Sequence, residues 1–167
     1  MDDVGRRAAR LLEEAQAGRA EDVLTRVEAL LREPTGDLAD GAAPLHFVRV
    51  VSLIMMDQLR ACLAATDLML RAAERDGSVG WRACALATRA SEGLRLGDLD
   101  IAEHDVDAAL RDLIAAEALL ALGDGDRIAA INARVGVGMG YRMLRLYELV
   151  GPQYQAAYEL STSDPAG

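Results

Sequence analysis

The sequence predicts an all-α protein whose helices, about eight of them, pair as antiparallel hairpins in a stack. Hydrophobic residues make up 51% of the 167-residue chain but aromatic residues only 4%, so alanine and leucine must fill the core, and both favour helices. Apolar residues also recur every three or four positions along almost the whole chain. Short turn signals separate these periodic segments, as expected for neighbouring antiparallel helices.

The first hairpin is predicted over about 3–33. An apolar stripe precedes Gly18, which is expected to end the first helix. Glu21 and Asp22 then open the second helix, because acidic side chains favour the positive, N-terminal end of a helix dipole.

The second hairpin is predicted over about 44–76. Pro44 suits the first turn of a helix. A break is expected at Met56-Asp57-Gln58, and a further helix follows from Leu59. Asp76-Gly77-Ser78 has the composition of a loop and ends the hairpin.

The third hairpin is predicted over about 80–122, with Gly97 as the turn between a helix that ends at Leu96 and one that begins at Leu99. The loop that follows, Gly123 to Asp126, lacks the later oxygen ligands of a calcium-binding loop, so it is interpreted as a simple turn.

The fourth hairpin is predicted over about 127–161. It begins with a long helix over 127–150. Gly151-Pro152 is expected to turn the chain, and a shorter helix follows over 153–161.

Length and charge limit the class of protein. The length suits a single domain, assigned to 1–162, with a disordered tail at 163–167. The net charge is −9 and every basic residue is arginine, which argues against binding to nucleic acid or to an anionic membrane surface. The longest apolar stretch, Pro44 to Met56, is too short to cross a bilayer. We therefore expect a soluble, cytoplasmic protein.

The side chains that usually carry chemistry are few and scattered. Cys62 and Cys84 lie in apolar helical segments and are expected to be buried free thiols. His46 and His104 are the only histidines, and neither has a second ligand at metal-binding spacing. The sequence therefore predicts no catalytic residues, no metal site, no cofactor and no enzymatic activity for this chain.

A glycine-rich stretch, RVGVGMGYR (Arg134 to Arg142), allows two interpretations. A dinucleotide-binding loop needs G-x-G-x-x-G between a strand and a helix, and here Tyr141 holds the third glycine position. The alternative is a buried helix that packs very closely against its neighbours, with Gly136 and Gly140 on one face. The helical spacing of the preceding apolar residues favours the second interpretation.

One motif recurs along the chain: a glycine ends one helix, and a small or apolar residue follows five or six positions later. It occurs at 17–23, 96–102 and 150–156. Gly97, Ala102 and the pair Ala109-Leu110 make the middle copy resemble the tetratricopeptide repeat. That resemblance implies helical hairpins stacked as a right-handed superhelix that serves protein–protein interaction.

A second resemblance concerns three longer segments, Leu45 to Met56, Gly77 to Ala90 and Tyr141 to Ser161. They are similar to the N-terminal helical-repeat region of actinobacterial GGDEF-type diguanylate cyclases. This resemblance implies a sensory or regulatory region that precedes a cyclase domain in cyclic-di-GMP signalling. The chain itself has no GGDEF sequence, so it is not the cyclase.

The repeat model also predicts a binding surface. If Gly97 and Gly151 are hairpin turns, the first helix of each hairpin lines the concave side of the superhelix. The candidate partner- or ligand-binding residues on that side are His46, Ser91, Arg95, Tyr141 and Arg145.

Tyrosine and arginine also gather near the C-terminal end, a pairing that binding surfaces favour. The group comprises Tyr141, Arg142, Arg145, Tyr147, Tyr154 and Tyr158. The alternative is that these tyrosines fill gaps between hairpins while the arginines lie on a solvated face.

The leading functional hypothesis is a non-catalytic protein-interaction or sensory domain. Its partner would be a protein, a peptide or its own output domain, and a homodimer is possible. The alternative is a stand-alone small-molecule or peptide sensor that holds its ligand between the hairpins.

Overall fold

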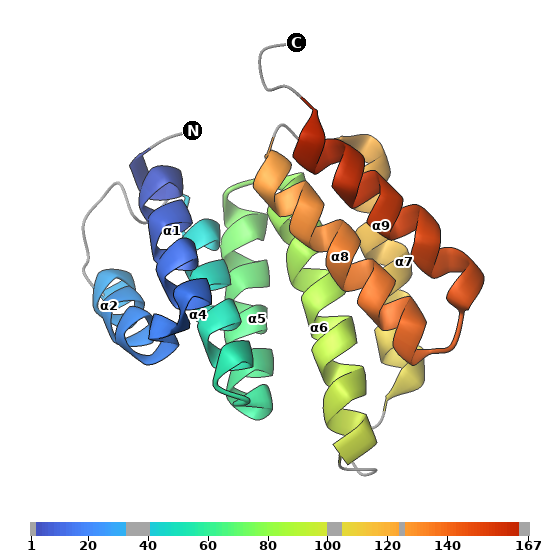
Figure 1. Ribbon diagram of the computed structural model, residues 1–167, viewed down its shortest axis with the longest axis horizontal. Coiled ribbons are helices and arrows are strands. Elements are labelled where there is room, and N and C mark those ends of the chain that lie inside the picture. Colours follow the sequence, from blue (N-terminus) through green and yellow to red (C-terminus); the bar gives the residue numbers. More distant parts are fainter. Residues whose placement is uncertain (1–2, 33–40, 100–104, 124–125, 164–167) are drawn as a thin grey trace. The chain divides into compact units, whose positions relative to one another are not determined.

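The structure is a computed structural model that describes residues 3–32, 41–99, 105–123 and 126–163. Every regular element formed by these residues is a helix, and the helices pack mainly as adjacent antiparallel pairs (Figure 1). The predicted all-α class is therefore confirmed. The contacts group the chain into two compact units, Met1–Ser78 and Val79–Gly167, and each is described by itself.

The first unit is organised around one central helix. Its elements are α1 (Asp3–Glu14), a π-helical turn η1 (Ala15–Arg19), α2 (Ala20–Arg32), α4 (Ala43–Met55) and α5 (Leu59–Arg75). Helix α4 packs against α1, α2 and α5. Gly18 has a φ of 88° and bends the chain between α1 and α2, so the predicted helix end at this glycine is confirmed. The core here includes Leu11, Val23, Val27, Leu45 and Val48.

Two helix ends in the first unit share one turn geometry. Asp57 has a φ of 57°, and the next residue, Gln58, donates its backbone N–H to the Leu53 carbonyl at 2.9 Å. Gly77 has a φ of 66°, and Ser78 likewise donates to Ala73 at 3.0 Å. In both cases a left-handed residue lets the chain satisfy the last free carbonyls of a helix. Both breaks lie where the sequence predicts them.

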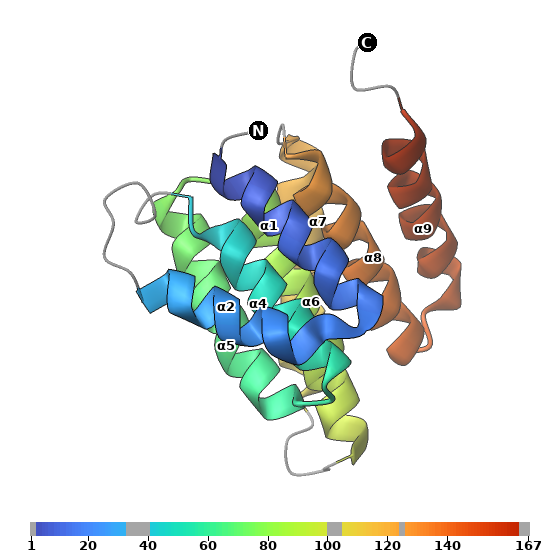
Figure 2. The same cartoon turned by 60° about the vertical axis from the view of Figure 1, so that its left-hand side comes forward.

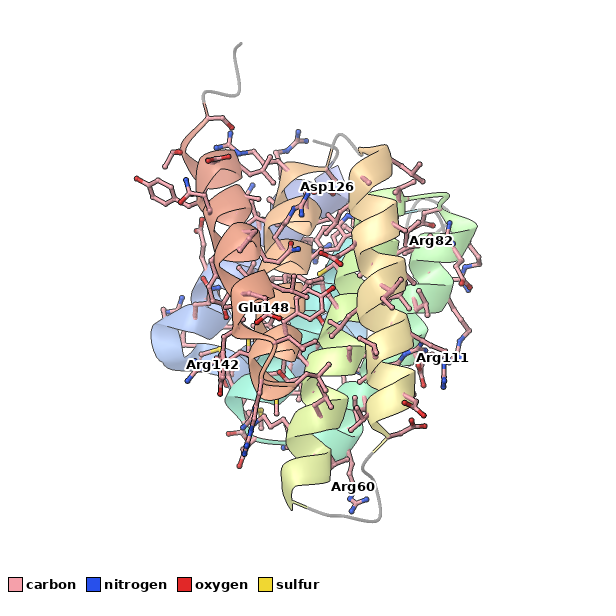
Figure 3. The ribbon with its side chains drawn as sticks, turned by 90° about the vertical axis from the view of Figure 1, so that its right-hand side faces the viewer. Arg60, Arg82, Arg111, Asp126, Arg142 and Glu148 are labelled. Carbon is pink, nitrogen blue, oxygen red and sulfur yellow. The ribbon has the colours of Figure 1, made fainter. Side chains whose placement is uncertain are left out.

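The second unit consists of α6 (Val79–Leu99), α7 (Val106–Leu122), α8 (Arg127–Met143) and α9 (Tyr147–Thr162). Helix α6 packs against α7 and α8, and α9 packs against α8 (Figure 2). Asp126 caps the start of α8 (Figure 3), because its carboxylate accepts the backbone N–H of Ala129 at 3.0 Å.

The predicted turn at Gly97 is wrong. Helix α6 continues through this buried glycine to Leu99, so no helix starts there. Helix α7 begins instead at Val106, after Asp105, whose carboxylate accepts the backbone N–H of Ala108 at 2.7 Å. A glycine weakens a helix by only about 1 kcal/mol, and burial against neighbouring helices can offset that. Residues 100–104, which include His104 and the predicted repeat position Ala102, lie outside the described residues.

The predicted turn at Gly151-Pro152 is also wrong. Helix α8 ends at Met143, and α9 has already begun at Tyr147. Arg145 has a φ of 60°, and Leu146 donates its backbone N–H to the Tyr141 carbonyl at 2.9 Å, which repeats the turn geometry of the first unit. The turn escapes sequence analysis because an arginine occupies the position that glycine usually takes.

Helix α9 accommodates the proline for two reasons. Pro152 is the sixth residue of the helix, so only one intrahelical hydrogen bond near the N-terminal end is lost. The preceding residue is a glycine, which has no Cβ to clash with the proline ring in a helical conformation.

Candidate functional site

The glycine-rich stretch forms the packing centre of the second unit. Each of its three glycines faces a different helix. A methyl group on Gly136 would lie 3.0 Å from Cβ of Ala87 in α6, and one on Gly138 would lie 2.7 Å from the ring of Tyr154 in α9. A methyl group on Gly140 would lie 2.7 Å from Leu113 in α7. The close-packing interpretation is thus confirmed, and the stretch is helix instead of a phosphate-binding loop.

A polar network lies between α7, α8 and α9. The carboxylate of Glu117 on α7 accepts hydrogen bonds from the Tyr141 hydroxyl on α8 and from the side-chain amide of Gln153 on α9. The amide oxygen of Gln153 in turn accepts a hydrogen bond from the Arg134 guanidinium at 2.9 Å. Burial, and then the hydrogen bond to Glu117, raise the pKa of Tyr141 well above its usual value. The phenol therefore stays protonated and serves as a donor.

The five predicted site residues are divided between the two units, and the four in the second unit have different surroundings. Tyr141 is buried in the Glu117 network, and Arg145 lies exposed in the turn before α9. Ser91 is buried in α6 and donates to the Thr88 carbonyl at 3.2 Å. Arg95 lies one turn further along α6, with its guanidinium 3.2 Å from the carboxylate of Glu92. His46 belongs to α4 in the first unit.

His46 is largely withdrawn from solvent. Its Nδ1 atom is buried and has no hydrogen-bond partner within the part of the chain that the structure describes. Burial, followed by the nearby charges of Arg49 and Arg75, lowers its pKa from the usual 6.5 to about 4. The imidazole is therefore neutral near pH 7.

A different set of side chains is exposed on the outer side of the α8–α9 pair. Five large apolar side chains are solvent-accessible there: Val135 (37%), Met139 (38%), Tyr147 (64%), Tyr154 (37%) and Tyr158 (64%). Arg142 is exposed near the end of α8, where the chain turns towards α9 (Figure 3). We call these six residues the α8–α9 face.

Helix geometry makes this face continuous. Val135 and Arg142 lie three residues before and four residues after Gly138, so they share its side of α8. Gly138 lies under the ring of Tyr154, which joins that side of α8 to α9. Tyr147 and Tyr158 lie seven residues before and four residues after Tyr154, so all three tyrosines form one stripe. The face thus spans both helices.

The sequence identified part of this surface. The tyrosine and arginine group was predicted, but the structure divides it, with Tyr141 in the buried network and the other tyrosines on the α8–α9 face. Val135, Met139, Glu117 and Gln153 were not predicted. The spacing of Tyr147, Tyr154 and Tyr158 would have revealed the stripe if α9 had been predicted to begin before Gly151.

Other kinds of site have little support in the described ranges. The thiols of Cys62 and Cys84 are buried, as predicted, and neither belongs to a disulfide bond. Among the residues that the structure describes, no group of three or more His, Cys, Asp or Glu side chains could hold a metal ion. None of the helices described is both long enough and apolar enough to cross a membrane.

Comparison with known proteins does not assign this chain to a family. No family model, no curated protein and no solved structure matches it significantly.

Proposed function

We propose that this chain is a non-catalytic, tetratricopeptide-repeat-like helical domain that receives a protein partner through the α8–α9 face. The observation that carries the proposal is the continuous row of exposed apolar and aromatic side chains on that face. Tyrosine, methionine and arginine are the residues enriched in the cores of protein interfaces, where tyrosine and arginine often contribute most of the binding energy. Single exposed apolar residues need no explanation, but a contiguous set does.

The resemblance of three segments to the region before GGDEF domains supports a regulatory role. We propose that the chain is the N-terminal regulatory part of a diguanylate cyclase in cyclic-di-GMP signalling. In that setting the partner is the output domain of the same protein or a second signalling protein.

Photo-cross-linking in cells of the source organism tests this function. A benzophenone amino acid placed at Tyr158 is expected to form a covalent adduct with a protein. The matched control is the same amino acid at Ile114 on α7, which is similarly exposed, at 57%, but lies outside the face. An adduct of equal yield from both positions, or none from Tyr158, would contradict the proposal.

A further inference from the structure

Two exposed arginines lie at one end of the α8–α9 face. Arg142 lies on the face itself, and Arg145 lies at its end, in the turn that joins the two helices. Both side chains are exposed, and neither forms an ion pair with any residue that the structure describes.

The acidic residues of α9 lie on a different side of the helix. Glu148 and Glu159 each follow a tyrosine of the stripe by one residue, so each is rotated by about 100° around the helix axis. This rotation places them away from the buried side, which Gln153 and Ala157 mark. Figure 3 shows Glu148 on α9 beside the helix end where Arg142 lies. The α8–α9 face thus carries apolar side chains along its length and two arginines at one end, while Glu148 projects from a neighbouring side of α9.

The tyrosine stripe also has one open position. Gly151 lies four residues after Tyr147 and three before Tyr154, so it belongs to the same side of α9. It is exposed, and a methyl group placed on it would have no neighbouring atom within 4 Å. The stripe can therefore accept an apolar side chain between the two tyrosines, in the way that a knob fits a hole between helices.

We propose that the α8–α9 face binds an acidic amphipathic helix of a partner protein. The partner's apolar side chains, repeated every three or four residues, contact Val135, Met139 and the tyrosines, and one of them lies over Gly151. Its carboxylates, at one end, pair with Arg142 and Arg145. The stripe from Tyr147 to Tyr158 is about 16 Å long, which matches three turns of such a helix. This inference rests on the proposed function and specifies the chemistry of the partner.

Binding of synthetic peptides to the full chain tests it. The probe is a fluorescein-labelled helical peptide about four turns long, with leucines at i, i+3, i+4 and i+7 and glutamates at one end. Two further peptides carry glutamine or lysine in place of the glutamates. We expect the glutamate peptide to bind most tightly by fluorescence anisotropy, the glutamine peptide to bind more weakly, and the lysine peptide to bind least.

Variants of the protein locate the site. Arg142→Gln and Arg145→Gln are each expected to raise the Kd of the glutamate peptide about tenfold, and added salt should reduce the difference. Met139→Asp should weaken binding of all three peptides. The control is Arg111→Gln, an exposed arginine on α7 (Figure 3), which should leave the Kd unchanged. Circular dichroism confirms that each variant is folded.

Several outcomes would overturn the inference. Equal affinity for the glutamate and lysine peptides would show that the face does not recognise charge. An unchanged Kd of Arg142→Gln for the glutamate peptide would show that the peptide binds at another site. Tighter binding of a labelled single-stranded oligonucleotide than of any peptide would point to nucleic acid, since tyrosine and arginine also stack on bases. If Tyr158 gives a cross-linked protein but the glutamate peptide does not bind, the proposed function stands and this inference fails.

Discussion

At the scale of single residues, the glycines of α8 and α6 differ in what surrounds them. Gly136 faces the Cβ and the backbone carbon of Ala87, at 3.0 and 3.3 Å from an added methyl group. Gly93 in α6 has no atom within 4 Å of that position. A side chain at position 136 would press against α6, whereas position 93 has room for one.

This difference predicts opposite effects of the same substitution. Gly93→Ala is expected to raise the free energy of unfolding by up to about 1 kcal/mol through helix propensity. Gly136→Ala should lower it by about 1 kcal/mol, and Gly136→Leu by about 3 kcal/mol or more, because backbone cannot yield to the added atoms. Urea unfolding measures the free energy of unfolding of each variant. Equal stabilities of the two alanine variants would show that α6 and α8 do not approach this closely.

A second prediction at this scale concerns His46 and pH. Its pKa is about 4 in the folded chain but about 6.5 in the unfolded chain, so between these values the unfolded state binds more protons. The free energy of unfolding should therefore fall as the pH is lowered from about 6.5 to 4, by on the order of 2 kcal/mol for a partly exposed imidazole. Charges of Arg49, Arg75 and Asp76 contribute to this environment.

Unfolding of wild type and His46→Gln by urea at several pH values measures this contribution. The variant should lose the part of the pH dependence that lies between pH 4 and 6.5. His104→Gln is the control, and NMR titration of the two imidazoles gives their pKa values directly. A His46 pKa near 6.5 would contradict the prediction.

At the scale of elements, α9 has little apolar attachment to the rest of its unit. Its buried residues are Gln153 and Ala157, and Tyr154 covers Gly138. Near its C-terminal end the Arg127 guanidinium donates to the Ser161 carbonyl at 2.7 Å. Helices α6 and α7 are joined by a different polar contact, an ion pair in which the Arg89 guanidinium bonds both carboxylate oxygens of Asp112, at 2.7 and 2.8 Å. The Glu117 network is therefore a principal connection of α9.

Removal of the Glu117 carboxylate tests this connection. Glu117→Ala leaves the Tyr141 hydroxyl and the Gln153 amide unpaired, which should destabilise the chain by about 2 to 4 kcal/mol. Amide hydrogen exchange should accelerate first in α9. The control, Glu159→Ala, removes an exposed carboxylate that pairs with Gln155 at 2.8 Å, and should change stability by less than about 0.5 kcal/mol. Similar losses in the two variants would contradict the assigned role of Glu117.

Most helices can be predicted from the sequence, but not all of their ends. Apolar periodicity identified α2, α4 and α5 with small errors at their ends, because these helices have a distinct buried face. The ends of α6 and α8 differ from those predicted, because Gly97 and Gly151 lie inside helices and do not end them. A glycine marks a helix end only where its φ is positive or where no neighbouring helix packs against it. Neither condition can be predicted from the composition of the segment.

At the scale of the whole molecule, the aromatic residues are distributed unevenly between the units. Trp81 and all four tyrosines belong to the second unit, and Phe47 is the only aromatic residue of the first. Trp81 is buried, so its fluorescence reports the unfolding of the second unit. Circular dichroism at the helix wavelength reports both units.

These two probes test whether the units unfold independently. If they do, the denaturant midpoint from Trp81 fluorescence should differ from at least one phase of the circular dichroism transition. Residues 79–167 alone should also retain a cooperative transition with the same fluorescence midpoint. Coincident curves, together with an unfolded 79–167 fragment, would show that the two units form one cooperative structure.

The site was harder to predict than the fold because it depends on which helices meet. Tyr141 and Tyr154 have the same chemistry, but one bonds Glu117 on a third helix and the other covers a glycine. Those partners lie 24 and 16 residues away along the chain. Spacing within one segment can place side chains on a common face, but it cannot tell which neighbouring element will cover that face.

At Arg145, the residue that would best stabilise the turn differs from the residue that the proposed binding needs. An arginine with a φ of 60° is less stable there than glycine by about 1 kcal/mol. Arg145→Gly should therefore raise the free energy of unfolding and also raise the Kd for an acidic helical peptide. Selection for stability alone would favour glycine at this position. An arginine that is retained there would therefore indicate selection for another property, such as binding.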